Sequence, residues 1–348
     1  MAQIHEDGVR TPTPRAWVAL IAATRLEVEP LLAVWGATDC GEVSDGDTVS
    51  GTGASRGAGE TPASQTASTA ECVVLEVVHR RWHVFAAIPG ARPGDTEMGA
   101  VVVETGYDKT NTAQALTSLL ERAEAGRLPA SAGSGWESKP RLVLQFGIAG
   151  AYPRSGLNVG DVVVATDEVY ADTGASTPGG WLSTECFGIP LVTVAGRPSW
   201  NRFVLDRAIS GRAARRLRWR EPGTGDRPAD VTRVEAGPCL TLSCVTGTEE
   251  EADNLWRRWG ALGESMEGAA AAHICLLYGL PLLEVRAISN LVGDRDREAW
   301  DVPGAAARAA RAAAYLLTQL EEIFPPASGA FGQSTPPKSG VLAESDNQ

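Results

Sequence analysis

Two carboxylates and a serine–asparagine pair stand where predicted strands and helices begin or end. Glu27 comes just after an apolar run of strand length, and Met266 and Glu267 open a helix of alanine and glycine residues. Ser289 and Asn290 end another apolar strand. Open α/β sheets build ligand sites where a helix N-terminus and a strand C-terminus meet. Carboxylates accept hydrogen bonds and protons, and a side-chain amide both donates and accepts, so these groups could bind a small polar ligand and move a proton.

Each of these polar residues also has a structural explanation. Thr24 and Glu27 have the spacing of a capping box, in which the glutamate binds the backbone at the start of a helix. Glu267 could offset the dipole of the helix that follows it, and Asn290 could be a turn residue. Their common position at one edge of the predicted sheet favours the ligand site.

Apolar runs of strand length alternate with helix-like segments over most of the chain. The predicted strands are 16–23, 71–78, 82–88, 100–105, 141–146, 159–165, 231–245 and 281–288. This order predicts an α/β fold, a single domain with a central mixed, largely parallel sheet flanked by helices. A glycine-rich turn from Gly147 to Ala151 follows strand 141–146, and such a turn lets a ligand approach backbone N–H groups closely.

Composition along the chain predicts one ordered domain with less ordered segments around it. Residues 1–15 are expected to form a disordered leader, 16–323 the domain and 324–348 a disordered tail. Residues 36–70 are rich in Gly, Ser, Thr and Asp, so they cannot bury enough apolar surface to offset their ordering entropy. We expect them to be a flexible insertion. The Gly- and Pro-rich stretch 170–190 is a candidate rim or lid of the site.

Overall charge and cysteine usage exclude several classes of protein. The chain has 31 Lys and Arg against 43 Asp and Glu, so no basic surplus exists for a nucleic-acid partner. The basic run 212–220 is expected to be a solvated helix face. No apolar window is long enough to span a membrane, and residues 1–15 contain no secretory signal. Six cysteines without a CxxC pair indicate reduced thiols in a cytoplasmic protein.

Motifs for metals and cofactors are missing from the sequence. The first strand-to-helix turn has no GxGxxG, and the loop with Lys109 does not match the phosphate-binding GxxxxGK[ST] pattern. His79 and His83 are expected on the surface of the strand pair rather than on a metal. Asp294 and Asp296 alternate with arginines, which favours ion pairing over a cation site. We therefore expect no metal and no cofactor.

Motifs along the chain resemble the purine nucleoside phosphorylase and nucleosidase superfamily. They are FGIAGA (146–151) with VGDVV (159–163), SMEGAA (265–270) and VRAISN (285–290). The resemblance includes the first strand with Glu27, and it spans about residues 16–322 apart from 36–70. The motifs are specific in combination and occur in the order found in the family. The nearest members are methylthioadenosine/S-adenosylhomocysteine nucleosidases and futalosine hydrolases.

The resemblance implies a role for each residue at the sheet edge. Met266 would pack on the apolar face of a ribose, and Glu267 would accept hydrogen bonds from its hydroxyls. Glu27 matches the residue that positions and deprotonates an attacking water. Anionic groups near the sugar also stabilise an oxocarbenium-like transition state. The remaining residues implied in substrate binding are Ile148, Ala149, Gly150 and Ser289.

Position 290 decides which base the resemblance implies. Members that cleave adenine have an aspartate there, whereas the amide of Asn290 can donate to N7 or to a 6-oxo group. That suits hypoxanthine or guanine better than adenine, and an asparagine at this position is typical of futalosine hydrolases. The resemblance thus implies a metal-free hydrolase that releases hypoxanthine and dehypoxanthine futalosine from futalosine, in menaquinone biosynthesis. It also implies a homo-oligomer, a dimer or larger.

Other functions stay open at this point. One is a methylthioadenosine/S-adenosylhomocysteine-type nucleosidase. Another is a purine nucleoside phosphorylase, which would need phosphate-binding arginines, yet the glycine turn has none before Arg154 and Arg25 lacks a glycine context. A third is a purine-nucleoside binding module without catalysis. The presence of both Glu27 and Glu267 favours an enzyme, because binding alone does not require a base near C1′.

Overall fold

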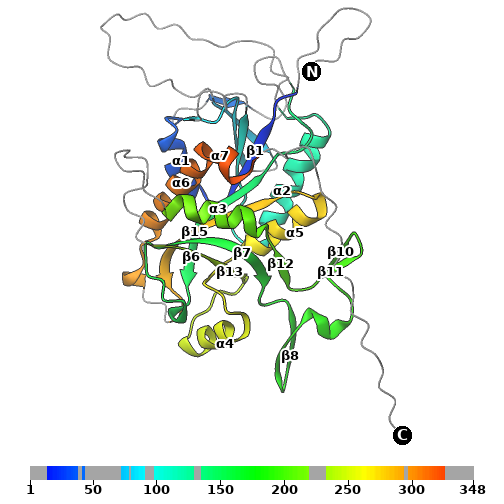
Figure 1. The fold of residues 1–348 in the computed structure, drawn as a ribbon, viewed down its shortest axis with the longest axis vertical. Helices are drawn as coiled ribbons and strands as arrows, with labels where there is room; N and C mark the ends of the chain where they lie inside the picture. The colour runs from blue at the N-terminus through cyan, green and yellow to red at the C-terminus, as the bar shows by residue number, and fades with distance from the viewer. Residues whose placement is uncertain are drawn as a thin grey trace, which may run out of the picture.

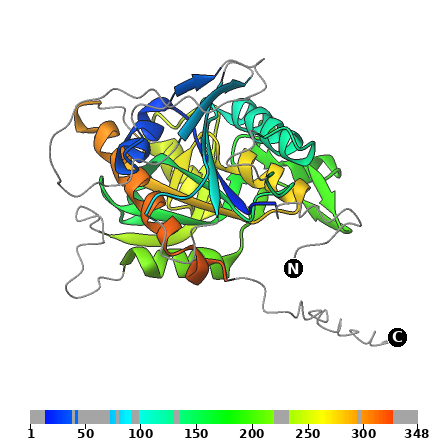
Figure 2. The same cartoon turned by 90° about the horizontal axis from the view of Figure 1, so that it is seen from above.

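The computed structural model describes residues 14–37, 41–43, 72–77, 80–90, 98–128, 135–218, 233–293 and 297–325. Within these residues the chain forms a mixed sheet with helices on both faces (Figure 1), and the view from above separates the helix layers (Figure 2). The predicted fold class, a mixed α/β sheet flanked by helices, is confirmed.

The strands of this sheet follow the order β12-β7-β13-β14-β6-β1-β5-β4-β3-β2, and β15 pairs with both β6 and β7. Their bounds are β1 (Trp17–Ala22), β2 (Gly41–Val43), β3 (Cys72–Val77), β4 (Arg80–Phe85), β5 (Gly99–Glu104), β6 (Val143–Ala151), β7 (Val162–Tyr170), β12 (Arg202–Val204), β13 (Val234–Thr241), β14 (Gly263–Ser265) and β15 (Leu282–Leu291). The neighbours β5, β1, β6 and β15 are parallel. The strands β6, β15, β7, β13 and β14 close into a ring, because β14 pairs with β6 and β15 with β7.

Helices cover both faces because the central strands are apolar on both. One face of β1, with Val18 and Leu20, shares a core cluster with helical residues of α1, α3, α6 and α7. The other face, with Trp17 and Ile21, packs with residues of α2 and α5. Continuous apolar runs are expected for parallel strands covered on two sides. The helix bounds are α1 (Arg25–Val34), α2 (Lys109–Glu124), α3 (Arg207–Arg218), α4 (Glu249–Trp259), α5 (Gly268–Tyr278), α6 (Val302–Thr318) and α7 (Leu320–Ile323).

The stretch 170–190 is more regular than the expected loop. It contains the hairpin of β8 (Gly174–Thr177) and β9 (Gly180–Ser183), followed by the short helix η2 (Thr184–Phe187). Gly180, with φ 109°, provides the left-handed residue of the hairpin turn. A second hairpin of β10 (Val192–Val194) and β11 (Arg197–Ser199) follows, and both hairpins project from the body of the domain (Figure 1).

Part of the stretch expected as a flexible insertion, 36–70, is a strand. Residues 41–43 form β2, which pairs in parallel with β3. Most of the remaining insertion lies outside the described residues, as do nearly all of the leader 1–15 and the tail 324–348. The predicted pairing of strands 71–78 and 82–88 is confirmed by the antiparallel β3 and β4. The expectation of a surface position is wrong for His83, which is buried with Nε2 3.5 Å from a Glu104 oxygen, and His79 lies outside the described residues.

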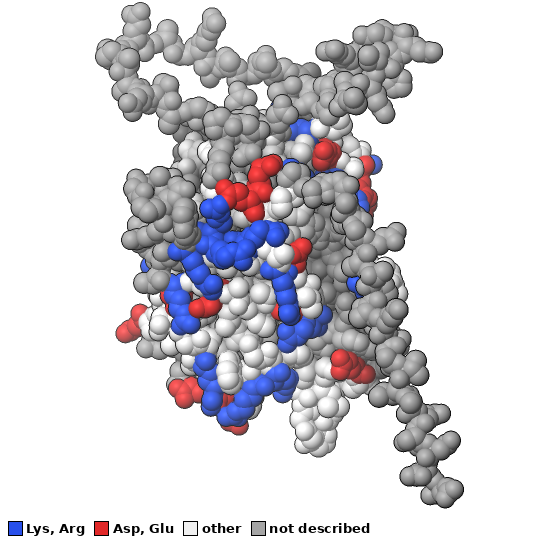
Figure 3. Space-filling model, viewed as in Figure 1, with Lys and Arg blue, Asp and Glu red and all other residues white. Residues whose placement is uncertain are grey.

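Arginines gather on the surface over α3, in the middle of the face seen in Figure 3. Several are engaged: Arg216 pairs with Glu322, and Arg218 lies 2.9 Å from a Glu235 oxygen. This pairing fits the expectation of a solvated helix face. Among the described helices, none is long and apolar enough to cross a membrane.

Candidate active site

Glu27 is positioned by the turn that joins β1 to α1. Thr24 caps the helix, and its backbone N–H donates to Glu27 Oε2 at 3.0 Å, so the capping box predicted from the sequence is present. The other oxygen, Oε1, accepts from the backbone N–H of Ile148 on β6 at 2.9 Å. Glu27 therefore caps its own helix with one oxygen and reaches the central strand with the other. The structural explanation of this residue is confirmed, and its catalytic role stays a prediction.

The environment of Glu27 makes its carboxylate more basic than that of an exposed glutamate. The residue is buried, and this burial raises the pKa of the carboxyl above its ordinary value, as does the negative charge of Glu267. Arg286 and the backbone N–H groups of Ile148 and Thr24 act in the opposite direction. A carboxylate with a raised pKa takes up a proton more readily, which is the property required of a general base.

Glu267 comes directly before α5 and is 5% exposed. Its Oε2 accepts from Nη1 of Arg286 at 3.1 Å and from its neighbour, the Met266 N–H, at 3.3 Å. Its Oε1 lies 3.4 Å from the backbone N of Asp108. Asp108 has φ 78°, an uncommon value for a residue with a side chain. It lies in the turn before α2, and its N–H points toward Glu267.

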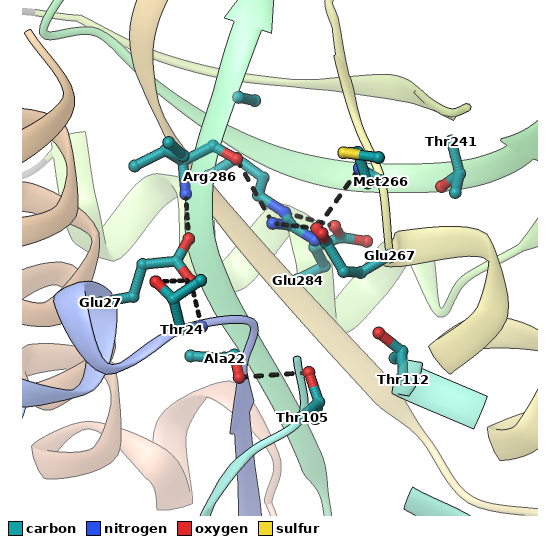
Figure 4. Close-up of polar contacts among 12 residues, drawn as sticks. Ala22, Thr24, Glu27, Thr105, Thr112, Thr241, Met266, Glu267, Glu284 and Arg286 are labelled. Carbon is teal, nitrogen blue, oxygen red and sulfur yellow. Dashed lines mark hydrogen bonds and ion pairs between the residues drawn. The ribbon is translucent and has the colours of Figure 1, made fainter. Parts of the chain in front are cut away.

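Arg286 is the site residue that the sequence reasoning missed. It lies in the middle of β15, is 1% exposed and donates through Nη1 to Glu267 and to the carbonyl of Ile148, the latter at 3.3 Å. Figure 4 shows its guanidinium between Glu267 and Glu284, with Glu27 on the neighbouring α1. A signal was present: a charged residue inside an apolar strand of a buried sheet needs a charged partner.

Gly147 makes the approach of these charges possible. It is the register partner of Arg286 on the adjacent strand β6. A Cβ at this position would lie 2.4 Å from Glu27 Oε1 and 2.9 Å from Arg286 Nη1. A glycine is therefore required for the carboxylate and the guanidinium to occupy their positions over β6.

Ser289 and Asn290 lie at the end of β15. An irregularity in the pairing with β6 between Ile288 and Asn290 sets Asn290 opposite Gly150. The Ser289 hydroxyl donates to Asn290 Oδ1 at 2.8 Å, and Asn290 Nδ2 donates to the carbonyl of Leu291 at 3.0 Å. These bonds fix the orientation of the amide.

The structure brings the predicted site residues to one region of the sheet. Glu27 bonds to Ile148, Ile148 and Glu267 bond to Arg286, and Ser289 lies 3.3 Å from the carbonyl of Ala149. Their roles toward a substrate stay predictions. Within the described part of the chain, no group of three or more His, Cys, Asp and Glu side chains is arranged to hold a metal ion.

Comparisons with known proteins found similar sequences and a similar fold. Residues 82–321 match the family model described as the phosphorylase superfamily. The chain is 38% identical over 221 residues to a futalosine hydrolase of Thermus thermophilus, which covers 64% of this chain and 82% of that protein. It is 37% identical over 185 residues to a futalosine hydrolase of Streptomyces coelicolor, covering 53% and 68%. Among solved structures, an S-adenosylhomocysteine nucleosidase from Streptococcus pyogenes has the same fold, with a TM-score of 0.59, 19% identity and coverage of 88% and 98%.

Proposed function

Because the chain belongs to the phosphorylase superfamily, we propose that it hydrolyses the N-glycosidic bond of futalosine and releases hypoxanthine and dehypoxanthine futalosine. The observation that carries the proposal is the arrangement of buried Glu27 and Glu267 around Arg286, with Asn290 at the end of the same strand. The reaction would belong to menaquinone biosynthesis.

In the proposed reaction Glu27 is the general base. It takes a proton from a water whose oxygen forms the bond to C1′ of the ribose, while the bond from C1′ to the base nitrogen breaks. The electron pair of that bond leaves with hypoxanthine, which takes a proton from solvent. Glu267 accepts hydrogen bonds from the ribose hydroxyls, and its negative charge stabilises the positive charge that develops on the sugar. Met266 packs on the ribose.

Arg286 links the two carboxylates of the site. It donates to Glu267 and to the Ile148 carbonyl, and the N–H of Ile148 donates to Glu27. Glu267 is thus held as a paired anion at the sugar, while the pKa of Glu27 remains raised by burial. Two carboxyl groups in different environments can serve as an anion and a base in one reaction.

Water rather than phosphate is the proposed nucleophile. The buried Glu27 carboxylate occupies the first turn and would repel a phosphate dianion placed beside it. Arg25, the arginine of that turn, is exposed and pairs with Glu29 at 2.5 Å on the outer face of α1. These features support hydrolysis over phosphorolysis.

Hypoxanthine is the proposed leaving base because Asn290 cannot act as an acid. Its Oδ1 accepts from Ser289, so its NH₂ group is the part that can donate to N7 or to the 6-oxo group of a purine. A 6-amino group offers no acceptor to this donor. A nucleosidase of the methylthioadenosine type would instead rely on an acidic side chain at this position.

We also propose that the chain acts as a homo-oligomer, a dimer or larger, in the cytoplasm and without a nucleic-acid partner. Exposed apolar side chains on the projecting hairpin region, including Phe187 at 55% and Ile189 at 73%, support a subunit contact there. The described cysteines are free thiols, which is usual in a reducing compartment. The formal net charge of −12 disfavours binding to phosphate backbones.

The proposal is tested by incubating the purified protein with futalosine, inosine and methylthioadenosine, each with and without phosphate. Chromatography of the products should show hypoxanthine released from futalosine at a rate independent of phosphate. Adenine released from methylthioadenosine as the dominant product would overturn the argument from Asn290. A requirement for phosphate would replace hydrolysis by phosphorolysis.

A further inference from the structure

A second layer of buried charge lies behind the site. Arg286 donates through Nε to Glu284 Oε1 at 2.7 Å, and the carboxyl group of Glu168 on β7 lies beside that of Glu284. Both carboxyl groups are completely buried. Neither residue is part of the proposed reaction, yet each is a costly group to place in a protein interior.

These groups belong to a chain of polar contacts around the start of α5. The Ala269 N–H donates to the Thr241 hydroxyl at 2.7 Å, and this hydroxyl donates to Glu168 Oε2 at 2.7 Å. From Glu168 the chain continues to the adjacent carboxyl group of Glu284. Arg286 donates to both Glu284 and Glu267, the residue that precedes α5 (Figure 4). These contacts therefore connect the ribose-binding carboxylate to three strands, β13, β7 and β15.

The helix is fitted closely onto the two carboxyl groups. A Cβ at Gly268, the first residue of α5, would lie 2.4 Å from Glu168 Oε1 and 2.6 Å from Glu284 Oε1. The two oxygens thus lie directly beneath the helix start. Any movement of either carboxyl group would be transmitted to Glu267 through the backbone as well as through Arg286.

Charge balance indicates that one of the two carboxyl groups is protonated. The carboxyl groups around the Arg286 guanidinium are those of Glu27, Glu168, Glu267 and Glu284. Burial, followed by the charge of Glu284, raises the pKa of Glu168 well above its ordinary value. Glu168 Oε1 receives no hydrogen bond from the described residues, so it is free to carry a proton and to donate it to Glu284.

We propose that Glu284 is a positioning residue of the hydrolase: with protonated Glu168 as its partner, it anchors Arg286 so that Nη1 lies between Glu267 and Ile148. This inference rests on the proposed function, because it assigns the second layer to the same reaction. Glu284 touches no reacting atom. It acts through Arg286, and Arg286 acts through the two carboxylates of the site.

The proposal predicts a pH dependence with a defined sign. The groups facing Glu168 are Glu284 and Arg286 from β15, Thr241 and Cys239 from β13, and Tyr170 from its own strand. When pH rises through the raised pKa of Glu168, this group loses its proton, and the carboxylates of Glu168 and Glu284 then repel each other and compete for the Arg286 guanidinium. Activity should therefore fall on the alkaline side.

The test compares Glu284→Gln and Glu168→Gln with Asp167→Asn as a matched control. Asp167 is a buried carboxylate next to Glu168 in sequence, but it faces Arg202 and Arg207 at 3.5 Å. Glu284→Gln should lower kcat by about 10- to 100-fold with KM changed less than about threefold, in line with misplacement of a site group. Asp167→Asn should change kcat by less than about threefold.

Glu168→Gln separates positioning from a simple packing role. Its amide can donate to Glu284 as the carboxylic acid does, so kcat near neutral pH should fall much less than in Glu284→Gln, and the alkaline limb should disappear. An alkaline limb unchanged in Glu168→Gln, or equal losses of kcat in both variants, would overturn the proposal. So would a Glu284→Gln enzyme that is less stable but has normal kcat.

An infrared measurement tests the pair without using activity. The difference spectrum between wild type and Glu168→Gln at neutral pH should contain the carbonyl band of a protonated carboxyl group. Absence of that band would refute the shared proton. The kinetics are measured with whichever nucleoside the wild-type protein cleaves. A wild type that cleaves another nucleoside would contradict the futalosine proposal alone, whereas unchanged kcat in Glu284→Gln would contradict the positioning role.

Discussion

A single methyl group at Gly147 tests the geometry of the site most directly. In Gly147→Ala the new Cβ would lie 2.4 Å from Glu27 Oε1 and 2.9 Å from Arg286 Nη1, both too close for non-bonded contact. The backbone of Gly147 is not left-handed, so alanine is acceptable to the chain itself. The substitution therefore acts on the two side chains rather than on the strand.

The expected losses of stability and of kcat in Gly147→Ala depend on which atom moves away from the new methyl group. Glu27 Oε1 is the end of a flexible side chain, so the cost to stability should lie at the low end of the overpacking range of about 1–3 kcal/mol. Catalysis should suffer more, because Oε1 would have to leave the Ile148 N–H, now 2.9 Å away. A displacement of about 1 Å in a site can cost roughly 100-fold in rate. We expect a kcat about 100-fold lower in a folded protein.

The assay is hypoxanthine release at saturating futalosine, together with urea unfolding. Gly211→Ala is the control: its Cβ in α3 would lie 3.6 Å from Arg215, an ordinary contact. That helical substitution should raise the free energy of unfolding by roughly 0.5–1 kcal/mol without changing kcat. A folded Gly147→Ala enzyme with kcat within about threefold of wild type would refute the argument that this close approach is needed.

Further predictions concern the groups proposed to contact substrate. Glu27→Gln should lower kcat by about 10²- to 10⁴-fold while futalosine binding, measured by calorimetry, is retained; an active variant would remove Glu27 from the reaction. The kcat/KM of the wild type should fall as pH drops through the pKa of Glu27, which burial raises above 4.5, so an acid limb at or below 4.5 would contradict the assignment. Asn290→Asp should raise the kcat/KM ratio of methylthioadenosine over futalosine by at least about tenfold, and an unchanged ratio would show that another residue selects the base.

Site residues at the ends of strands and helices could be predicted from the sequence. Glu27 follows the first strand and Asn290 ends the last one, and the carboxyl ends of parallel strands meet at one edge of a sheet. The structure added that Glu27 uses both of its oxygens, one in the capping box and one on Ile148.

The second layer of buried charge, Glu284 with Glu168, could not be predicted from the sequence, because it depends on which interior strands are neighbours. Glu284 and Arg286 are two residues apart and so share one face of β15, a spacing that does indicate a pair. Glu168 lies more than a hundred positions earlier, on a strand that β15 meets in antiparallel pairing. That pairing closes the ring, and an alternation of strands and helices predicts parallel neighbours instead.

The ring of strands also has a consequence for synthesis of the chain. Its last member to leave the ribosome is β15, which pairs with β6 on one side and with β7 on the other. Until then both older strands have open edges, and contacts over such long separations form slowly. The nascent chain thus carries two unpaired edges from the completion of β7 at Tyr170 until β15 begins at Leu282. A chain ending before residue 282 would keep them, which makes such a C-terminal truncation prone to aggregate rather than merely inactive.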